Sequence, residues 1–208
     1  CSSDLCKSKA VMSQVRLSPS RVRLLETCEF AYNYQYNEDH ENGRMEPAFL
    51  LGGRLFHYWA DAYTKFLIAN DRPFDHDTAL VIADEGQAGL PFEVYEDIRT
   101  LFLRWAGGAT FTNLEQTKSE LRLAFDSDWQ PVEWDSEDAF VRMILDKVEK
   151  VGDEIVITDY KTSQAIQPLN KLAGKTYAKG VSIVLGEDFK IVRYVEDFVR
   201  YNVLKELI

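Results

Sequence analysis

The chain has 208 residues, of which 46% are hydrophobic and 28% charged, and its formal net charge is −10. This composition excludes a disordered chain, and the longest apolar runs are far too short to cross a bilayer. The negative charge counts against nucleic-acid binding over the whole surface, because phosphate binding requires clustered Lys and Arg. Three cysteines are too few for a disulfide framework and favour a reducing, cytoplasmic compartment.

The first five residues, Cys1 to Leu5, resemble the translated end of a short-read sequencing adapter. The chain also lacks an initiator Met. We therefore expect residues 1–5 to be an artefact of a gene assembled from environmental reads. Residues 6–208 are expected to form a single domain that is truncated at its C-terminus. A processed or trimmed chain is the alternative.

A helix start is predicted at the beginning of the next segment. Ser18 is placed to cap the helix, and Pro19 suits the first helical position. Val22, Leu25 and Cys28 then recur at helical spacing, which predicts one apolar face.

Helical periodicity continues after a polar stretch at 37–44, which is expected to be a loop. Helices are predicted at 49–69, 78–86 and 92–106, with a break around Pro73 and an end at Gly107-Gly108. Six side chains form the expected buried stripe of the helix at 49–69: Leu51, Leu55, Phe56, Trp59, Tyr63 and Phe66.

The period then changes from helical to alternating. Strands are predicted at 119–125, 140–148 and 154–160, the last two joined by a turn at 149–153 that contains Gly152. A helix at about 168–185 and a last strand at 191–201 follow. This order predicts an α/β (α+β) domain with a central mixed sheet flanked by helices.

The predicted hairpin carries the residues with the clearest chemistry. Asp159 and Lys161 point to the same side of their strand, and the returning strand can bring Asp146 close to Asp159. Two carboxylates suit a hard cation such as Mg²⁺, and a nearby Lys can orient a water and offset charge on a phosphate. These are the minimal parts for metal-assisted phosphodiester hydrolysis.

An exposed hairpin face and a surface ion pair are the alternative explanation of the same residues. Two features speak against it. Asp159 ends a strongly apolar strand, and Asp146 interrupts the apolar run at 141–148, where a charge is costly unless it is used.

Asp146 followed by Asp159-Tyr160-Lys161 after an apolar strand resembles the PD-(D/E)xK nuclease superfamily. Within it, the pattern is most similar to the RecB-like branch, which includes CRISPR-associated spacer-processing and AddAB-type nuclease domains. Gly53-x-x-x-His57 resembles the His motif of that branch, and Leu17 to Phe30 resembles its opening helix. The resemblance spans about 17–203 and implies a restriction-endonuclease-like core.

The resemblance also implies a set of site residues. Mg²⁺ or Mn²⁺ would be held by His57, Asp146, Asp159 and the main-chain carbonyl of Tyr160. The residues implied in catalysis are Asp146, Asp159, Lys161, Glu120 and Tyr177.

Two of these residues have bland alternatives. His57 would, without the motif, be a core or helix-surface histidine. Glu120 stands beside Arg122 on a strand face that is often merely solvated, and Glu115 and Glu133 compete for its role.

The chain departs from the family pattern at three points. Met143-Ile144-Leu145 replaces the small or Gly-rich approach to the first Asp, and Ala173 stands where a Gln is expected before Tyr177. Some branch members hold an iron–sulfur cluster, for which Cys28 would be one ligand in a longer gene product. Without later cysteines, Cys28 is expected here to be a small buried apolar residue.

Further residues could contact nucleic acid. A solvated helix face explains the lysines below equally well, and hydrophobic packing is favoured for at least two of the tyrosines. Lys171, Lys175 and Lys179 form a basic stripe on the predicted helix that bears Tyr177. An edge of a groove could be formed by Arg16, Arg21 and Arg23. A stacking surface for bases could be formed by Tyr32, Tyr34 and Tyr36.

The resemblance implies a metal-dependent DNA nuclease, and favours an exonuclease acting on single strands or duplex ends. Its expected setting is a prokaryotic or phage-encoded process such as replication, recombination, repair or CRISPR adaptation, with partner proteins from those systems. Two alternatives stay open. One is a catalytically silent module that binds nucleic acid or scaffolds a complex, and the other is a metal-dependent hydrolase with a closed pocket for another substrate.

Overall fold

A computed structural model describes residues 17–29, 32, 47–85, 89–186 and 191–208. Residues 1–5 and the predicted loop at 37–44 lie outside this part. Among the described residues the strands form one five-stranded sheet in the order β1-β2-β3-β4-β5. Only the β3–β4 pair is parallel, so the predicted mixed sheet is confirmed. The strands are β1 (Thr117–Phe125), β2 (Val141–Val151), β3 (Glu154–Tyr160), β4 (Ile191–Phe198) and β5 (Val203–Leu207).

The hairpin between β2 and β3 is tighter than predicted. Both strands continue to a turn of only two residues, Gly152 and Asp153, and Gly152 has a φ of 61°. A glycine with positive φ at the first central position is what a type II′ turn requires, and this turn matches the twist of the flanking strands. The predicted five-residue turn at 149–153 is therefore wrong.

The C-terminal strand prediction also needs correction. The expected strand at 191–201 stops at Phe198, and the chain turns back through Asn202, whose φ is 53°. Asn tolerates this left-handed backbone better than most residues. β5 then pairs antiparallel with β4 at the edge of the sheet.

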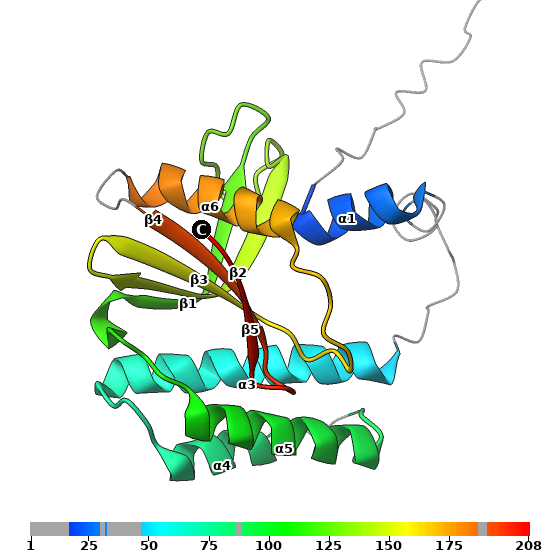
Figure 1. The fold of residues 1–208 in the computed structure, drawn as a ribbon, viewed down its shortest axis with the longest axis vertical. Coiled ribbons are helices and arrows are strands. Elements are labelled where there is room, and N and C mark those ends of the chain that lie inside the picture. Colours follow the sequence, from blue (N-terminus) through cyan, green and yellow to red (C-terminus); the bar gives the residue numbers. More distant parts are fainter. Residues whose placement is uncertain (1–16, 30–31, 33–46, 86–88, 187–190) are drawn as a thin grey trace, which may run out of the picture.

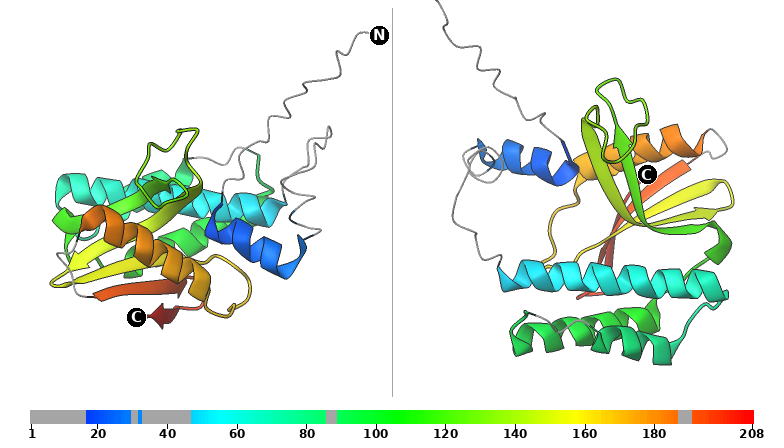
Figure 2. Two further views of the ribbon diagram at one scale, coloured as in Figure 1. Left: turned by 90° about the horizontal axis from the view of Figure 1, so that it is seen from above. Right: turned by 180° about the vertical axis from the view of Figure 1, so that it is seen from behind.

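Helices cover the two faces of the sheet (Figures 1 and 2). The helix α6 lies across one face, and α3, α4 and α5 form a layer on the other side. Side-chain caps begin three of the helices: Ser18 accepts from the Arg21 N–H, Asp75 from Thr78 and Asn170 from Ala173. The helices are α1 (Pro19–Thr27), α3 (Ala48–Asn70), α4 (His76–Asp84), α5 (Phe92–Gly108) and α6 (Lys171–Leu185), with a short 3₁₀ turn, η1 (Leu114–Gln116).

None of the helices among these residues combines the length and the apolar character that crossing a bilayer would require.

Two hydrophobic cores hold these layers together. The first lies among α3, α4 and α5 and includes Phe56, Trp59, Tyr63 and Phe102, all with no exposed area. Leu51, Leu55 and Phe66 of the predicted stripe are only partly buried. The second core lies between the sheet and α6, where Gly174 allows close packing because an added Cβ would lie 2.6 Å from Tyr194 Cδ1.

The helix α1 is less buried than predicted. Leu25 is 40% exposed, and Cys28 is exposed at the end of the helix. The expectation that Cys28 is a buried apolar residue is therefore wrong. Among the described elements, the helix packs chiefly against α6.

A half-buried carboxyl on the sheet face opposite α6 predicts how stability depends on pH. Burial raises the pKa of Asp197 from 3.8 to about 6, although the charge of Lys147 acts to lower it. The Asp197 carboxyl therefore binds its proton more tightly in the folded state than in the unfolded state. As a result, the free energy of unfolding falls as the pH rises from about 4 to about 6. We expect Asp197→Asn to stabilise the protein by about 1–2 kcal/mol at neutral pH, after allowance for partial exposure.

Urea unfolding of wild type and Asp197→Asn at about pH 7.5 and about pH 4 measures this effect. The gain should be present at the higher pH and absent at the lower one. An equal gain at both values would contradict the assignment.

Candidate metal centre

The candidate site begins where β2 and β3 separate. Their ladder ends at the pair Lys147 and Thr158, so that Asp146 and Asp159 are the next residues on the two strands. The Tyr160 N–H then donates to Asp146 Oδ2 at 2.7 Å, which means that a side chain takes the place of the next ladder partner. Asp146 is thus fixed at the fork by a backbone hydrogen bond.

Three side chains from three elements meet at this fork. His57 Nδ1 of α3 lies 3.1 Å from Asp146 Oδ1 of β2, and Glu120 of β1 completes the group. One ligand atom from each of the three lies within 4.8 Å of the others. Imidazole nitrogen and carboxylate oxygens are ordinary ligands of divalent cations. Within the described part of the chain this is the one such group.

Glu120 reaches the group from an unusual backbone conformation. Its φ is 48° although it lies inside β1, at the level of Asp146 between the pairs Ser119–Lys147 and Leu121–Leu145. A non-glycine residue in the left-handed region costs about 1–3 kcal/mol, and such residues concentrate at functional sites. This strain is a second feature, independent of the ligand atoms, that marks the position.

Asp159 lies beside the group and is held by a different set of contacts. Its Oδ2 accepts from Lys161 Nζ at 2.6 Å and from the Tyr194 hydroxyl at 2.7 Å. The Tyr194 hydroxyl also lies 3.1 Å from Glu196 Oε1, whose second oxygen is buried without a partner. Asp159 is not part of the group formed by His57, Glu120 and Asp146.

Tyr194 and Glu196 were missed by the sequence analysis. The available signal was Glu196, an acidic residue that follows the apolar pair Tyr194-Val195. In the sheet Glu196 is the register partner of Asp159.

The electrostatics of the group show excess negative charge. Burial raises the pKa of Glu120, and the charge of Asp146 raises it further. Burial also raises the pKa of Asp159, and Asp146 adds to this while Lys161 opposes it. Burial alone lowers the pKa of His57, but the charge and hydrogen bond of Asp146, with two further carboxylates, outweigh it and raise the pKa. A divalent cation would relieve this repulsion, so the residues present fit a metal.

The remaining predicted residues lie at varying distances from the group. Tyr160 packs its ring against Trp105 at 5.2 Å, on the side of the helical core. The Tyr177 ring lies 5.8 Å from the ring of Tyr194, whose hydroxyl contacts Asp159. Glu115 and Glu133, the competitors of Glu120, are exposed and outside the group.

The predicted nucleic-acid contacts are only partly described. Lys171, Lys175 and Lys179 are exposed, and Lys179 Nζ lies over the Trp129 ring at 3.9 Å. Tyr32 is 6% exposed, which favours packing over base stacking. Arg23 is exposed and Arg21 half-buried. Arg16, Tyr34 and Tyr36 lie outside the described residues.

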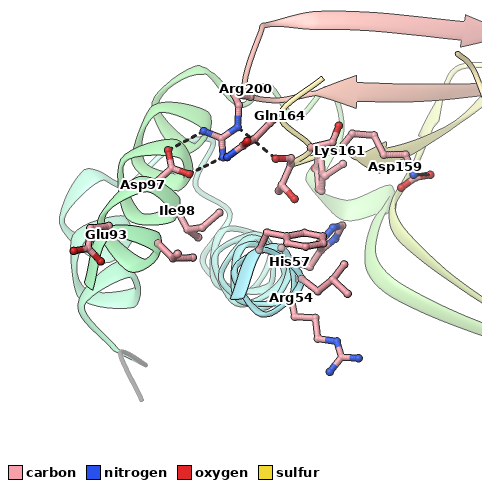
Figure 3. Close-up of a pocket in the computed structure, with 16 residues that line it drawn as sticks. Arg54, His57, Glu93, Asp97, Ile98, Asp159, Lys161, Gln164 and Arg200 are labelled. Carbon is pink, nitrogen blue, oxygen red and sulfur yellow. Dashed lines mark hydrogen bonds and ion pairs between the residues drawn. The ribbon is translucent and has the colours of Figure 1, made fainter. Parts of the chain in front are cut away.

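Two pockets open on either side of His57. The apolar pocket, of about 880 Å³, lies between α3, α5 and the segment after β3, and Asp159 and Lys161 form part of its wall (Figure 3). Its apolar lining comes from Phe49, Leu50, Val94 and Ile98. The basic pocket, of about 440 Å³, lies between α3 and β1 and is lined by Arg54, His57, Tyr58, Asp61, Lys65, Glu120 and Arg122.

Fold and site together define an α/β protein with a candidate divalent-metal centre next to a carboxylate–lysine pair. A family model described as the PD-(D/E)XK nuclease superfamily matches residues 16–178, which is more than half of the chain. The chain therefore belongs to the PD-(D/E)XK nuclease superfamily. No curated protein sequence matches it. Membership implies a nuclease, a hydrolase that uses a divalent metal and acts on nucleic acid.

Proposed function

We propose that the protein is a Mg²⁺- or Mn²⁺-dependent deoxyribonuclease of the RecB-like branch, acting as an exonuclease on DNA ends or single strands. The observation that carries the proposal is the convergence of His57, Glu120 and Asp146 beside the Asp159–Lys161 pair. Replication, recombination, repair and CRISPR adaptation in a prokaryotic or phage-encoded system are the settings that such an activity would serve.

In this proposal His57, Glu120 and Asp146 hold the cation, and Asp159 and the Tyr160 carbonyl complete its ligands from the adjoining strand. The cation would supply Lewis acidity at the phosphoryl oxygens. Asp146 is supported for this task because the Tyr160 N–H fixes its second oxygen. Its position is therefore set before a ligand arrives, which lowers the cost of organising the site.

Lys161 has a separate role in the proposal. Its side chain is 32% exposed and lines the apolar pocket, and its Nζ lies 2.6 Å from Asp159 Oδ2. From there it can orient the attacking water and offset the negative charge that builds on the phosphate during hydrolysis. Tyr194, which belongs to the core between the sheet and α6, donates its hydroxyl to the same oxygen of Asp159 and so helps to position the pair.

Cleavage of end-labelled DNA tests the proposal. We expect Mg²⁺ or Mn²⁺ to support degradation of a linear single strand, and EDTA to reduce the rate by at least about a thousandfold. A circular strand of the same sequence should resist if the enzyme requires an end, and 5′ and 3′ labels give the direction. Binding of DNA without cleavage of any substrate would favour the silent-module alternative.

A further inference from the structure

The two pockets beside the metal centre differ in their chemistry, although His57 lines both. On one side, Phe49 and Leu50 of α3 face Val94 and Ile98 of α5. On the other, the lining carries three cationic side chains, Arg54, Lys65 and Arg122, and two carboxylates, Asp61 and Glu120. Lys65 is paired with Asp61 at 2.7 Å, and Arg54 lines both pockets. A phosphodiester strand has two surfaces that match this division, the apolar faces of its bases and its charged backbone.

Beyond Lys161, the wall of the apolar pocket is poorly suited to phosphates. Two arginines, Arg54 and Arg200, line it. Arg200 is already bound to Asp97 through two hydrogen bonds of 2.8 and 2.7 Å (Figure 3). Glu93 adds a carboxylate to the same wall, and Figure 3 shows Arg54 pointing away from Lys161. In this part of the pocket a phosphate would therefore gain little from Arg200 and would be repelled by Glu93, whereas a neutral base would not be repelled.

Large apolar side chains are exposed at the mouth of the apolar pocket. Phe49 is 68% exposed and Leu50 is 47% exposed, both in the first turns of α3. The volume of about 880 Å³ lies within the range of roughly 300–1,000 Å³ that is typical of small-molecule sites. A paired base buries its faces in the stack, so only an unpaired base could use this surface.

We propose that the apolar pocket is a subsite for an unpaired nucleobase next to the scissile phosphate, and that the basic pocket holds the neighbouring phosphates. The proposal rests on the nuclease function proposed above. It assigns Phe49 as the stacking side chain and makes base contact, in addition to backbone charge, a determinant of substrate binding.

Strands with and without bases test the subsite. We expect wild type to degrade an ordinary single strand about ten- to hundredfold more efficiently, in kcat/KM, than a strand whose terminal nucleotides are abasic. Phe49→Ala should lower kcat/KM on the ordinary strand about tenfold and leave the abasic strand unchanged. Phe92→Ala is the matched control, because Phe92 is 63% exposed on α5 and does not line the pocket.

Equal losses on both strands in Phe49→Ala, or a wild type that is indifferent to base removal, would overturn the subsite while leaving the nuclease function standing. Fluorescence anisotropy of the same labelled strands in EDTA gives a readout that does not depend on cleavage. If no strand is cut, the nuclease proposal fails, and the binding difference between the two strands still decides whether the pocket takes a base.

Discussion

Asp146→Asn is expected to reduce metal-dependent cleavage by a thousandfold or more, on the order of the several kcal/mol that a correctly held metal contributes. The asparagine side chain keeps an oxygen that can accept from the Tyr160 N–H, but it loses the negative charge that faces His57 and the cation. It should also abolish the rise in melting temperature that Mg²⁺ or Mn²⁺ gives the wild type.

Asp146→Ala separates the metal role from the structural one. Alanine leaves the Tyr160 N–H without its partner in a part-buried position, which costs about 1–3 kcal/mol. Both variants should be inactive, but only alanine should lower stability in EDTA, measured by urea unfolding at about pH 8. Retained activity in Asp146→Asn would remove Asp146 from the metal centre.

Lys161→Met is expected to lower kcat by about a hundred- to a thousandfold while metal binding persists. Methionine keeps the length of the side chain and removes the ammonium, and Lys161 is not part of the ligand group. The metal-induced rise in melting temperature should therefore survive in Lys161→Met, unlike in Asp146→Asn. Lys161→Arg, which keeps the charge, should recover part of the activity.

The same pair of measurements can also contradict the assigned role. If Lys161→Met loses the metal-induced stabilisation together with activity, Lys161 acts by organising Asp159 for the metal. Loss of the ion pair at 2.6 Å would raise the pKa of Asp159 further, because Lys161 lowers it in the wild type. Loss of kcat with an unchanged metal-induced rise in melting temperature indicates a direct role of Lys161 in catalysis. Loss of both indicates that Lys161 organises Asp159.

The sequence was informative where the chemistry lies on neighbouring strands. Asp146, Asp159 and Lys161 follow from a hairpin, because a short turn forces the two strands into one register. His57 could be added only through the family pattern. It lies on a helix, 89 residues before Asp146 in the sequence. No local sequence signal determines where that helix packs.

Other features depend on tertiary structure and left little trace in the sequence. No glycine or asparagine next to Glu120 indicates a left-handed backbone at this position. Only the assembled sheet shows how the Glu120 side chain reaches Asp146. Asn202 was a usable turn signal, and its omission merged β4 with the turn and lost β5. Burial of Cys28 was inferred from the lack of later cysteines and from the usual burial of free cysteines, and neither shows whether a neighbour covers this position.

The ligand group bridges the two separately packed cores. His57 belongs to the helix whose neighbouring Phe56 is part of the helical core, whereas Glu120 and Asp146 lie on strands that pack against α6. A bound cation would link α3 to β1 and β2, and would therefore make the two cores unfold as one cooperative unit. Substitutions that let α3 shift relative to β1 would lower activity even where each core keeps its own stability. Stabilising substitutions should therefore be sought inside one core and not at the contact between α3 and β1.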